Sequence, residues 1–125
     1  MRAAFKYWIA VAVATAGIAH AEPIARIPVE DIRPLMLAAL DAPDGAAHGV
    51  LVGKLADAIS RRFASAAPII VDVSTEKRLA QTGCSRLKIS IAQDDVHLPG
   101  KATPQHQTFE MGINYCRDGL PPKSP

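Results

Sequence analysis

Two stretches near the end of the chain alternate apolar and polar residues, which is the pattern of half-buried strands. Over 85–92 the apolar positions are Leu87, Ile89 and Ile91, and over 109–115 they are Phe109, Met111, Ile113 and Tyr115. If the strands pair antiparallel with Cys84 opposite Cys116, the apolar side chains coincide along the whole ladder. A slip of one residue would set apolar positions against polar ones. The pattern therefore predicts this register, with the odd-numbered residues of 87–91 and 109–115 buried.

Two helices are expected earlier in the chain. Leu51, Leu55, Ile59 and Phe63 recur every fourth residue, which predicts an amphipathic helix over 46–65. Its two glycines, four residues apart, are either tolerated near a helix start or placed for close contact with another backbone. A shorter helix is expected over 31–40, because Asp31 can cap its N-terminus and Pro34 falls in its first turn.

The remaining segments complete an α+β fold. Residues 69–73 are β-branched and predict a buried strand, and Ser74 or Thr75 can cap a short helix through Gln81 that ends near Gly83. We expect a small single domain of about three helices against a three-stranded sheet, which ends in a disulfide-stapled antiparallel hairpin. The helices would cover one face of the sheet. Whether the strand at 69–73 lies parallel to 85–92 stays open.

The N-terminus carries the pattern of a secretory signal peptide. Arg2 and Lys6 precede an apolar run over 7–18, and Ala19-His20-Ala21 follows as an A-x-A cleavage site. The run is too short to cross a membrane as a helix, which disfavours the alternative of a retained anchor. We expect cleavage after Ala21, a domain over 22–120, a flexible Pro-rich tail over 121–125, and a periplasmic or secreted location.

Cleavage changes the balance of charge. Without Arg2 and Lys6 the chain keeps twelve basic and twelve acidic residues, so its formal net charge is zero. Nucleic acids and anionic membranes attract clustered positive charge, and both therefore become poor candidates as partners. Only three aromatic residues remain, namely Phe63, Phe109 and Tyr115. This small number also disfavours ligands that stack on aromatic faces.

The two cysteines predict one disulfide. Exported chains commonly pair their cysteines, and a bond from Cys84 to Cys116 agrees with the hairpin register. The alternatives are a metal-thiolate pair or two free reactive thiols. A catalytic redox pair usually has the spacing C-x-x-C, which this chain lacks.

The long connection between the last two strands, residues 93–106, is the candidate partner-binding loop. Its candidate contact residues are Asp94, Asp95, His97, Lys101 and His106. A metal site could be drawn from His97, His106 and Asp94, which suit zinc or copper, but their spacing matches no metal-binding motif. Solvated loop side chains are the simpler interpretation.

The sequence contains no pattern that specifies catalysis. It has no G-x-S-x-G motif and no glycine-rich phosphate loop. We therefore expect a non-enzymatic exported binding or accessory protein without a cofactor. Its partner would be another exported protein, bound at the long loop or as a strand added to an open sheet edge. The alternative is a periplasmic metal-binding protein that uses His97 and His106.

Overall fold

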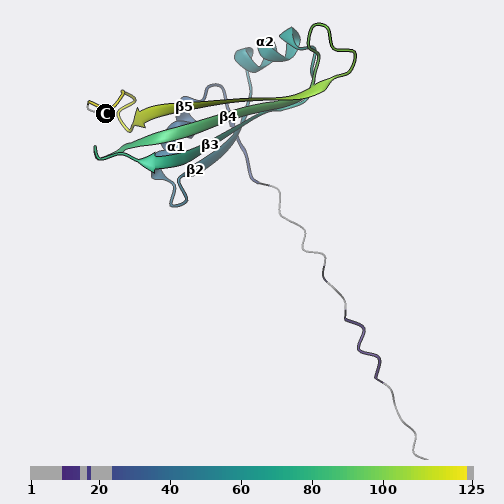
Figure 1. The fold of residues 1–125 in the computed structure, drawn as a ribbon, viewed down its shortest axis with the longest axis horizontal. Helices are drawn as coiled ribbons and strands as arrows, with labels where there is room; N and C mark the ends of the chain where they lie inside the picture. Colours follow the sequence, from purple (N-terminus) through teal and green to yellow (C-terminus); the bar gives the residue numbers. More distant parts are fainter. Residues whose placement is uncertain (1–9, 15–16, 18–23, 124–125) are drawn as a thin grey trace, which may run out of the picture.

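The computed structural model describes residues 10–14, 17 and 24–123. Within them, two helices pack on one mixed sheet of five strands in the order β1-β2-β3-β4-β5 (Figure 1). The strands are β1 (Ile27–Val29), β2 (Ala46–Leu51), β3 (Ile69–Arg78), β4 (Cys84–Val96) and β5 (Gln105–Cys116). Strand β1 runs parallel to β2, and all other neighbours are antiparallel. The expectation of three helices against a three-stranded sheet is therefore wrong.

The predicted helix over 46–65 is instead a strand followed by a helix. Residues 46–51 form β2, and helix α2 spans Lys54–Arg62. Gly53 separates the two elements with φ of +88°, a backbone conformation that favours glycine. In β2 the side chains alternate between buried and half-buried. Both sides of this strand carry apolar residues, so its period of two is hidden in the sequence.

The predicted short helix over 74–81 is also wrong. Strand β3 continues to Arg78 and pairs with β4 through a bulge between Thr75 and Lys77. The Thr75 hydroxyl, which we expected to cap a helix, donates a hydrogen bond of 2.8 Å to the carbonyl oxygen of Gly45. Residues 79–83 form only a connection, and β3 is therefore antiparallel to β4.

The predicted register of the hairpin is confirmed. Cys84 lies opposite Cys116, Leu87 opposite Ile113, and Ile91 opposite Phe109. A disulfide joins the two cysteines. The strands extend further than expected, because a shift in register after Gln93 carries the pairing on to Val96 and Gln105. The loop between them is thereby shortened to 97–104.

The predicted burial is only partly correct, because Ile91 on β4 and Ile113 on β5 are half-buried. Leu87, Ile89 and Tyr115 are buried, whereas Phe109 is 62% exposed and Met111 40% exposed. Helix α1 (Arg33–Asp41), which packs mainly on β2, β3 and β4, has nine residues and spans about 14 Å. Strand β5 has twelve residues and spans about 40 Å. The helix is too short to cover the whole strand.

The core lies between α1 and the sheet. Its largest fully buried side chains are Leu35, Val71, Val73, Leu87 and Ile89. Gly49 of β2 permits this close packing, since a Cβ atom there would lie 2.6 Å from a methyl carbon of Leu35. The predicted helix over 31–40 is thus close to α1, and Pro34 does lie in its first turn. Asp31 does not occupy the N-cap position, which is Ile32, but its carboxylate accepts the Arg33 backbone N–H at 2.8 Å.

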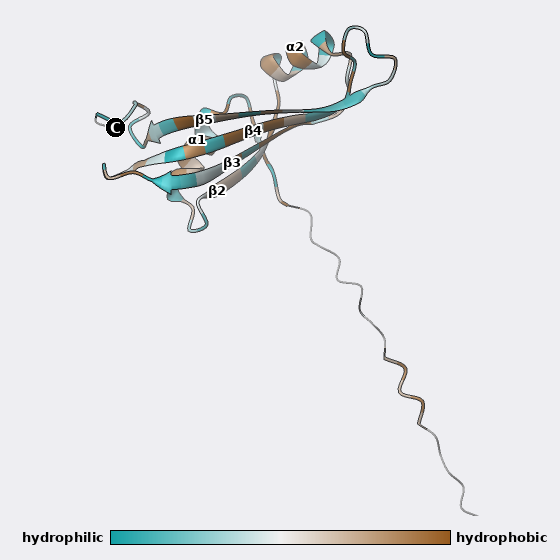
Figure 2. Ribbon diagram, viewed as in Figure 1, coloured by the Kyte–Doolittle hydropathy of each residue, from teal (hydrophilic) through white to brown (hydrophobic). Residues whose placement is uncertain are grey.

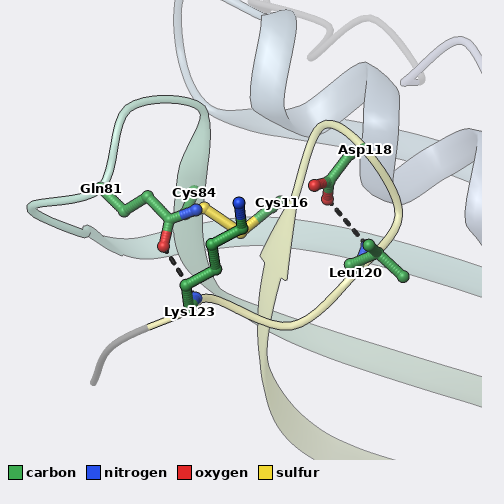
Figure 3. Close-up of a disulfide and its surroundings, with 6 residues drawn as sticks. All are labelled: Gln81, Cys84, Cys116, Asp118, Leu120 and Lys123. Carbon is green, nitrogen blue, oxygen red and sulfur yellow. Dashed lines mark hydrogen bonds between the residues drawn. A yellow bond between two sulfur atoms is a disulfide. The ribbon is translucent and has the colours of Figure 1, made fainter.

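The disulfide end of the sheet holds the segment that follows β5 (Figure 3). The Arg117 backbone N–H donates to the carbonyl oxygen of Gly83 at 2.9 Å, and the Lys123 N–H donates to the Gln81 side chain at 2.8 Å. The Arg117 guanidinium also pairs with Asp41 at the end of α1. The segment up to Lys123 therefore has defined contacts with the domain.

The predicted signal peptide lies largely outside the described residues. The positions of it that are described, 10–14 and 17, form no helix or strand. No helix in the described part of the chain is long and apolar enough to cross a membrane.

Candidate binding groove

Helix α2 lies at the end of the sheet away from the disulfide (Figures 1 and 2). Its residues form part of an apolar groove of about 260 Å³. One wall comes from α2 and the residue that follows it, and the other comes from the end of the β4–β5 hairpin. The residues that line it are Ile59, Phe63, Ile69, Ile91, Ala92, Gln93, Val96, Leu98, Gln107, Thr108 and Phe109. Phe109 is the most exposed large apolar side chain among them.

Local hydrogen bonds hold the two walls together. After α2 the chain turns so that the Ser65 hydroxyl donates to the carbonyl oxygen of Asp94 at 2.6 Å. The His97 backbone N–H donates to the carbonyl oxygen of Phe63 at 2.9 Å. Both contacts join the end of the helix to the tip of the hairpin. The groove is therefore built on secondary structure and does not depend on the loop alone.

Gln93 supplies the polar group of the groove. It is 6% exposed, and its amide nitrogen donates to the Ala67 carbonyl oxygen at 3.0 Å and to the Ser60 hydroxyl at 3.3 Å. Its Oε1 atom is buried and has no hydrogen-bond partner within the described part of the protein. An unsatisfied buried acceptor costs about 1–3 kcal/mol. A donor that reaches Oε1, after a small movement of the Gln93 side chain, would remove this cost.

The loop residues predicted to bind a partner are only partly brought together. Asp94 Oδ1 lies 2.5 Å from His106 Nδ1, and His106 Nε2 lies 2.9 Å from the Thr108 hydroxyl. The side chains of Asp95, His97 and Lys101 are exposed, and Asp95 occupies the bulge with φ of +55°. None of these five residues lines the groove, although Val96 and Leu98, their neighbours in the sequence, do.

The three residues considered as metal ligands, His97, His106 and Asp94, do not form one cluster. Among the residues that the structure describes, no group of three His, Cys, Asp or Glu side chains could hold a metal ion. The Asp94–His106 pair is therefore not joined by His97.

A second polar cluster lies around β2 and β3, on side chains that alternate with the core positions of these strands. His48 Nδ1 lies 2.7 Å from Asp72 Oδ1, and the Arg26 guanidinium donates to the same oxygen at 2.8 Å. Partial burial raises the pKa of the Asp72 carboxyl, but the bonds from Arg26 and His48 hold that pKa below its ordinary value of 3.8. Arg26 also donates to the Gly49 carbonyl oxygen at 3.2 Å. The cluster ties the segment before β1 to the sheet.

The sequence-based predictions included neither the groove around Gln93 nor the cluster around Asp72. The predicted helix over 46–65 includes His48, so its contact with Asp72 on β3 was not expected. A signal for Gln93 was present, because it continues the odd-numbered apolar positions of β4. A polar residue at such a position is expected to need a partner.

Comparison of the chain with protein-family models, with curated proteins and with solved structures found no match.

Proposed function

We propose that this protein is a small exported binding protein without enzymatic activity, whose groove holds an extended apolar segment of another exported protein. The observation that carries the proposal is the combination within one groove of an apolar lining and the unpartnered Oε1 atom of Gln93. Binding sites commonly combine a mostly apolar surface with a few polar groups that fix orientation. A peptide backbone N–H is a donor that fits this acceptor.

Three further features support the proposal. The groove lies next to the loop that the sequence marked as a partner-binding segment. Phe109 exposes an apolar surface at its edge, and a ligand could bury that surface. The Cys84–Cys116 disulfide is compatible with an oxidising compartment outside the cytoplasm.

The proposal is tested by selecting binders from a phage-displayed library of random peptides on the oxidised chain 22–125. We expect enriched peptides to carry apolar residues, and their binding to weaken at least about tenfold in Leu98→Asp, since a buried charge opposes an apolar contact. Leu55→Asp is the matched control. Leu55 is 52% exposed on α2 and does not line the groove, so this variant keeps binding.

Circular dichroism of both variants checks that they fold. The proposal is contradicted if no peptide is enriched, or if folded Leu98→Asp binds as tightly as the unaltered chain. In the metal-binding alternative, zinc or copper would instead raise the melting temperature, and His97→Ala with His106→Ala would abolish that rise.

A further inference from the structure

Strand β5 forms a long edge of the sheet with few of the features that protect edges. It has one neighbour, β4, and residues 108–112 are all exposed. It contains no lysine, arginine or proline, and its pairing with β4 is regular from Thr108 to Cys116. Natural edge strands are usually short, or carry such residues or bulges, because an open edge attracts another strand.

The opposite edge shows how this sheet protects itself elsewhere. Strand β1 has only three residues, and the middle one is Pro28. The contacts of residues 117–123, the described part of the C-terminal segment, also leave β5 open. Arg117 and Lys123 bond to Gly83 and Gln81 at the β3–β4 connection, and not along the outer side of β5.

We propose that β5 pairs antiparallel with β5 of a second copy of this chain, about a twofold axis at Met111, so that the two sheets become continuous. In this register Met111 lies opposite Met111 of the second copy, and Phe109 opposite Ile113. The exposed Phe109 and Met111 and the half-buried Ile113 thereby contact their counterparts. Directly opposed residues of paired strands lie about 4.5–5.5 Å apart at Cβ, close enough for these side chains to pack.

Charge complementarity selects this register. Gly112 has no side chain, and the guanidinium of Arg86 occupies the space above it, 2.6 Å from the position that a Cβ atom would take. Glu110 of the second copy lies opposite Gly112, so its carboxylate approaches that guanidinium. Within one chain, the nearest carboxylate paired with Arg86 is that of Glu76, at the long distance of 3.9 Å.

The two neighbouring registers of this strand pair are less favourable electrostatically. Because residues opposite each other must point to the same face, shifts occur in steps that keep odd residues opposite odd ones. One such shift sets Glu110 opposite Glu110. The other sets Gly112 opposite Gly112 and brings two Arg86 guanidinium groups together. Like charges directly opposite each other are destabilising.

The dimer does not rest on the proposed function. Phe109 belongs both to the groove and to the paired edge, but the test residues differ, because Leu98 lines the groove and Met111 does not. A monomeric protein would overturn the dimer and leave peptide binding at Leu98 unaffected.

Sedimentation equilibrium of the oxidised chain 22–125, from micromolar to millimolar concentration, tests the pairing. We expect a monomer–dimer equilibrium that weakens at least about tenfold in Met111→Lys, which opposes two positive charges at the axis. Leu37→Lys is the matched control: Leu37 is 36% exposed, against 40% for Met111, but it lies on α1. Dimerisation is unchanged in this control, and circular dichroism shows that both variants fold.

Cysteine cross-linking tests the register. Met111→Cys should form a disulfide between copies, because the two cysteines face each other across the axis, while the native bond is verified by peptide mapping. Phe109→Cys should not, because residues 109 of the two copies lie four positions apart along the strands. The proposal is overturned by a monomer at all concentrations, by unchanged dimerisation of Met111→Lys, or by cross-linking through Phe109→Cys instead of Met111→Cys.

Discussion

At the scale of single residues, Asp72 connects three parts of the fold that are far apart in the sequence. Its carboxylate contacts Arg26 before β1 and His48 on β2. The charged form of Asp72 is thus favoured in the folded state, and its pKa lies below 3.8 there. This lowered pKa stabilises the folded state at neutral pH. The stabilisation is lost as the pH falls below the ordinary pKa of the carboxyl and through its pKa in the folded state.

We therefore predict that Asp72→Asn lowers the free energy of unfolding at pH 7 and flattens its pH dependence in the acidic range. The loss is less than about 1 kcal/mol, because the side chain is 38% exposed and solvent screens its ion pairs. Urea unfolding at several pH values measures it. Asp95→Asn is the control, since asparagine also tolerates a positive φ and Asp95 forms no ion pair within the described residues. An equal loss in both variants would contradict the role of the cluster.

The groove residues differ in how far the sequence could reveal them. The loop predicted at 93–106, of which 97–104 lies outside the strands, stands out because its polar residues interrupt two alternating strands. Gln93 could have been found from its odd-numbered position in β4. The exposure of Phe109 could not, because the alternation places it on the apolar face without showing how far a helix reaches along that face.

At the scale of elements, the hairpin was predictable and the β2–α2 segment was not. In the hairpin, each strand has one apolar side, and the disulfide removes any freedom in the register. In β2, Ala46 and Val50 are apolar on the side opposite the core, so the alternation disappears. The apolar residues spaced by four from Leu51 to Phe63 therefore belong to two elements. Leu51 ends a strand, and the later residues lie on one side of a helix or directly after it.

The hairpin also makes the disulfide a measurable part of the stability. Cys84 and Cys116 are 32 positions apart, and closing a loop of this length in the unfolded chain is worth about 3–4 kcal/mol in the chain-entropy estimate. We predict that Cys84→Ala with Cys116→Ala lowers the free energy of unfolding by about 2–4 kcal/mol. Urea unfolding of the oxidised chain and of the double variant gives this difference. A difference near zero would mean that the bond does not constrain the unfolded chain.

At the scale of the whole molecule, the two ends of the sheet have different roles. The disulfide, α1 and the segment after β5 stabilise one end, where the core is closed. At the other end α2 stands apart from α1 (Figure 2). Apolar residues of α2, β3, β4 and β5 line the groove there. The stable end thus supports the apolar groove at the opposite end.

This division depends on the compartment, because the bond at the closed end forms under oxidising conditions. We predict that the full chain, expressed in a Gram-negative host, leaves the cytoplasm, loses residues 1–21 and carries no free thiol. A chain that starts at Glu22, expressed in the cytoplasm of the same host, should instead carry two alkylatable thiols and unfold at lower urea concentration. Intact-mass measurement before and after alkylation decides both points. A full-length mass recovered from membranes would mean that the N-terminal segment is a retained anchor. Free thiols in the exported form would mean that export does not bring about formation of the disulfide.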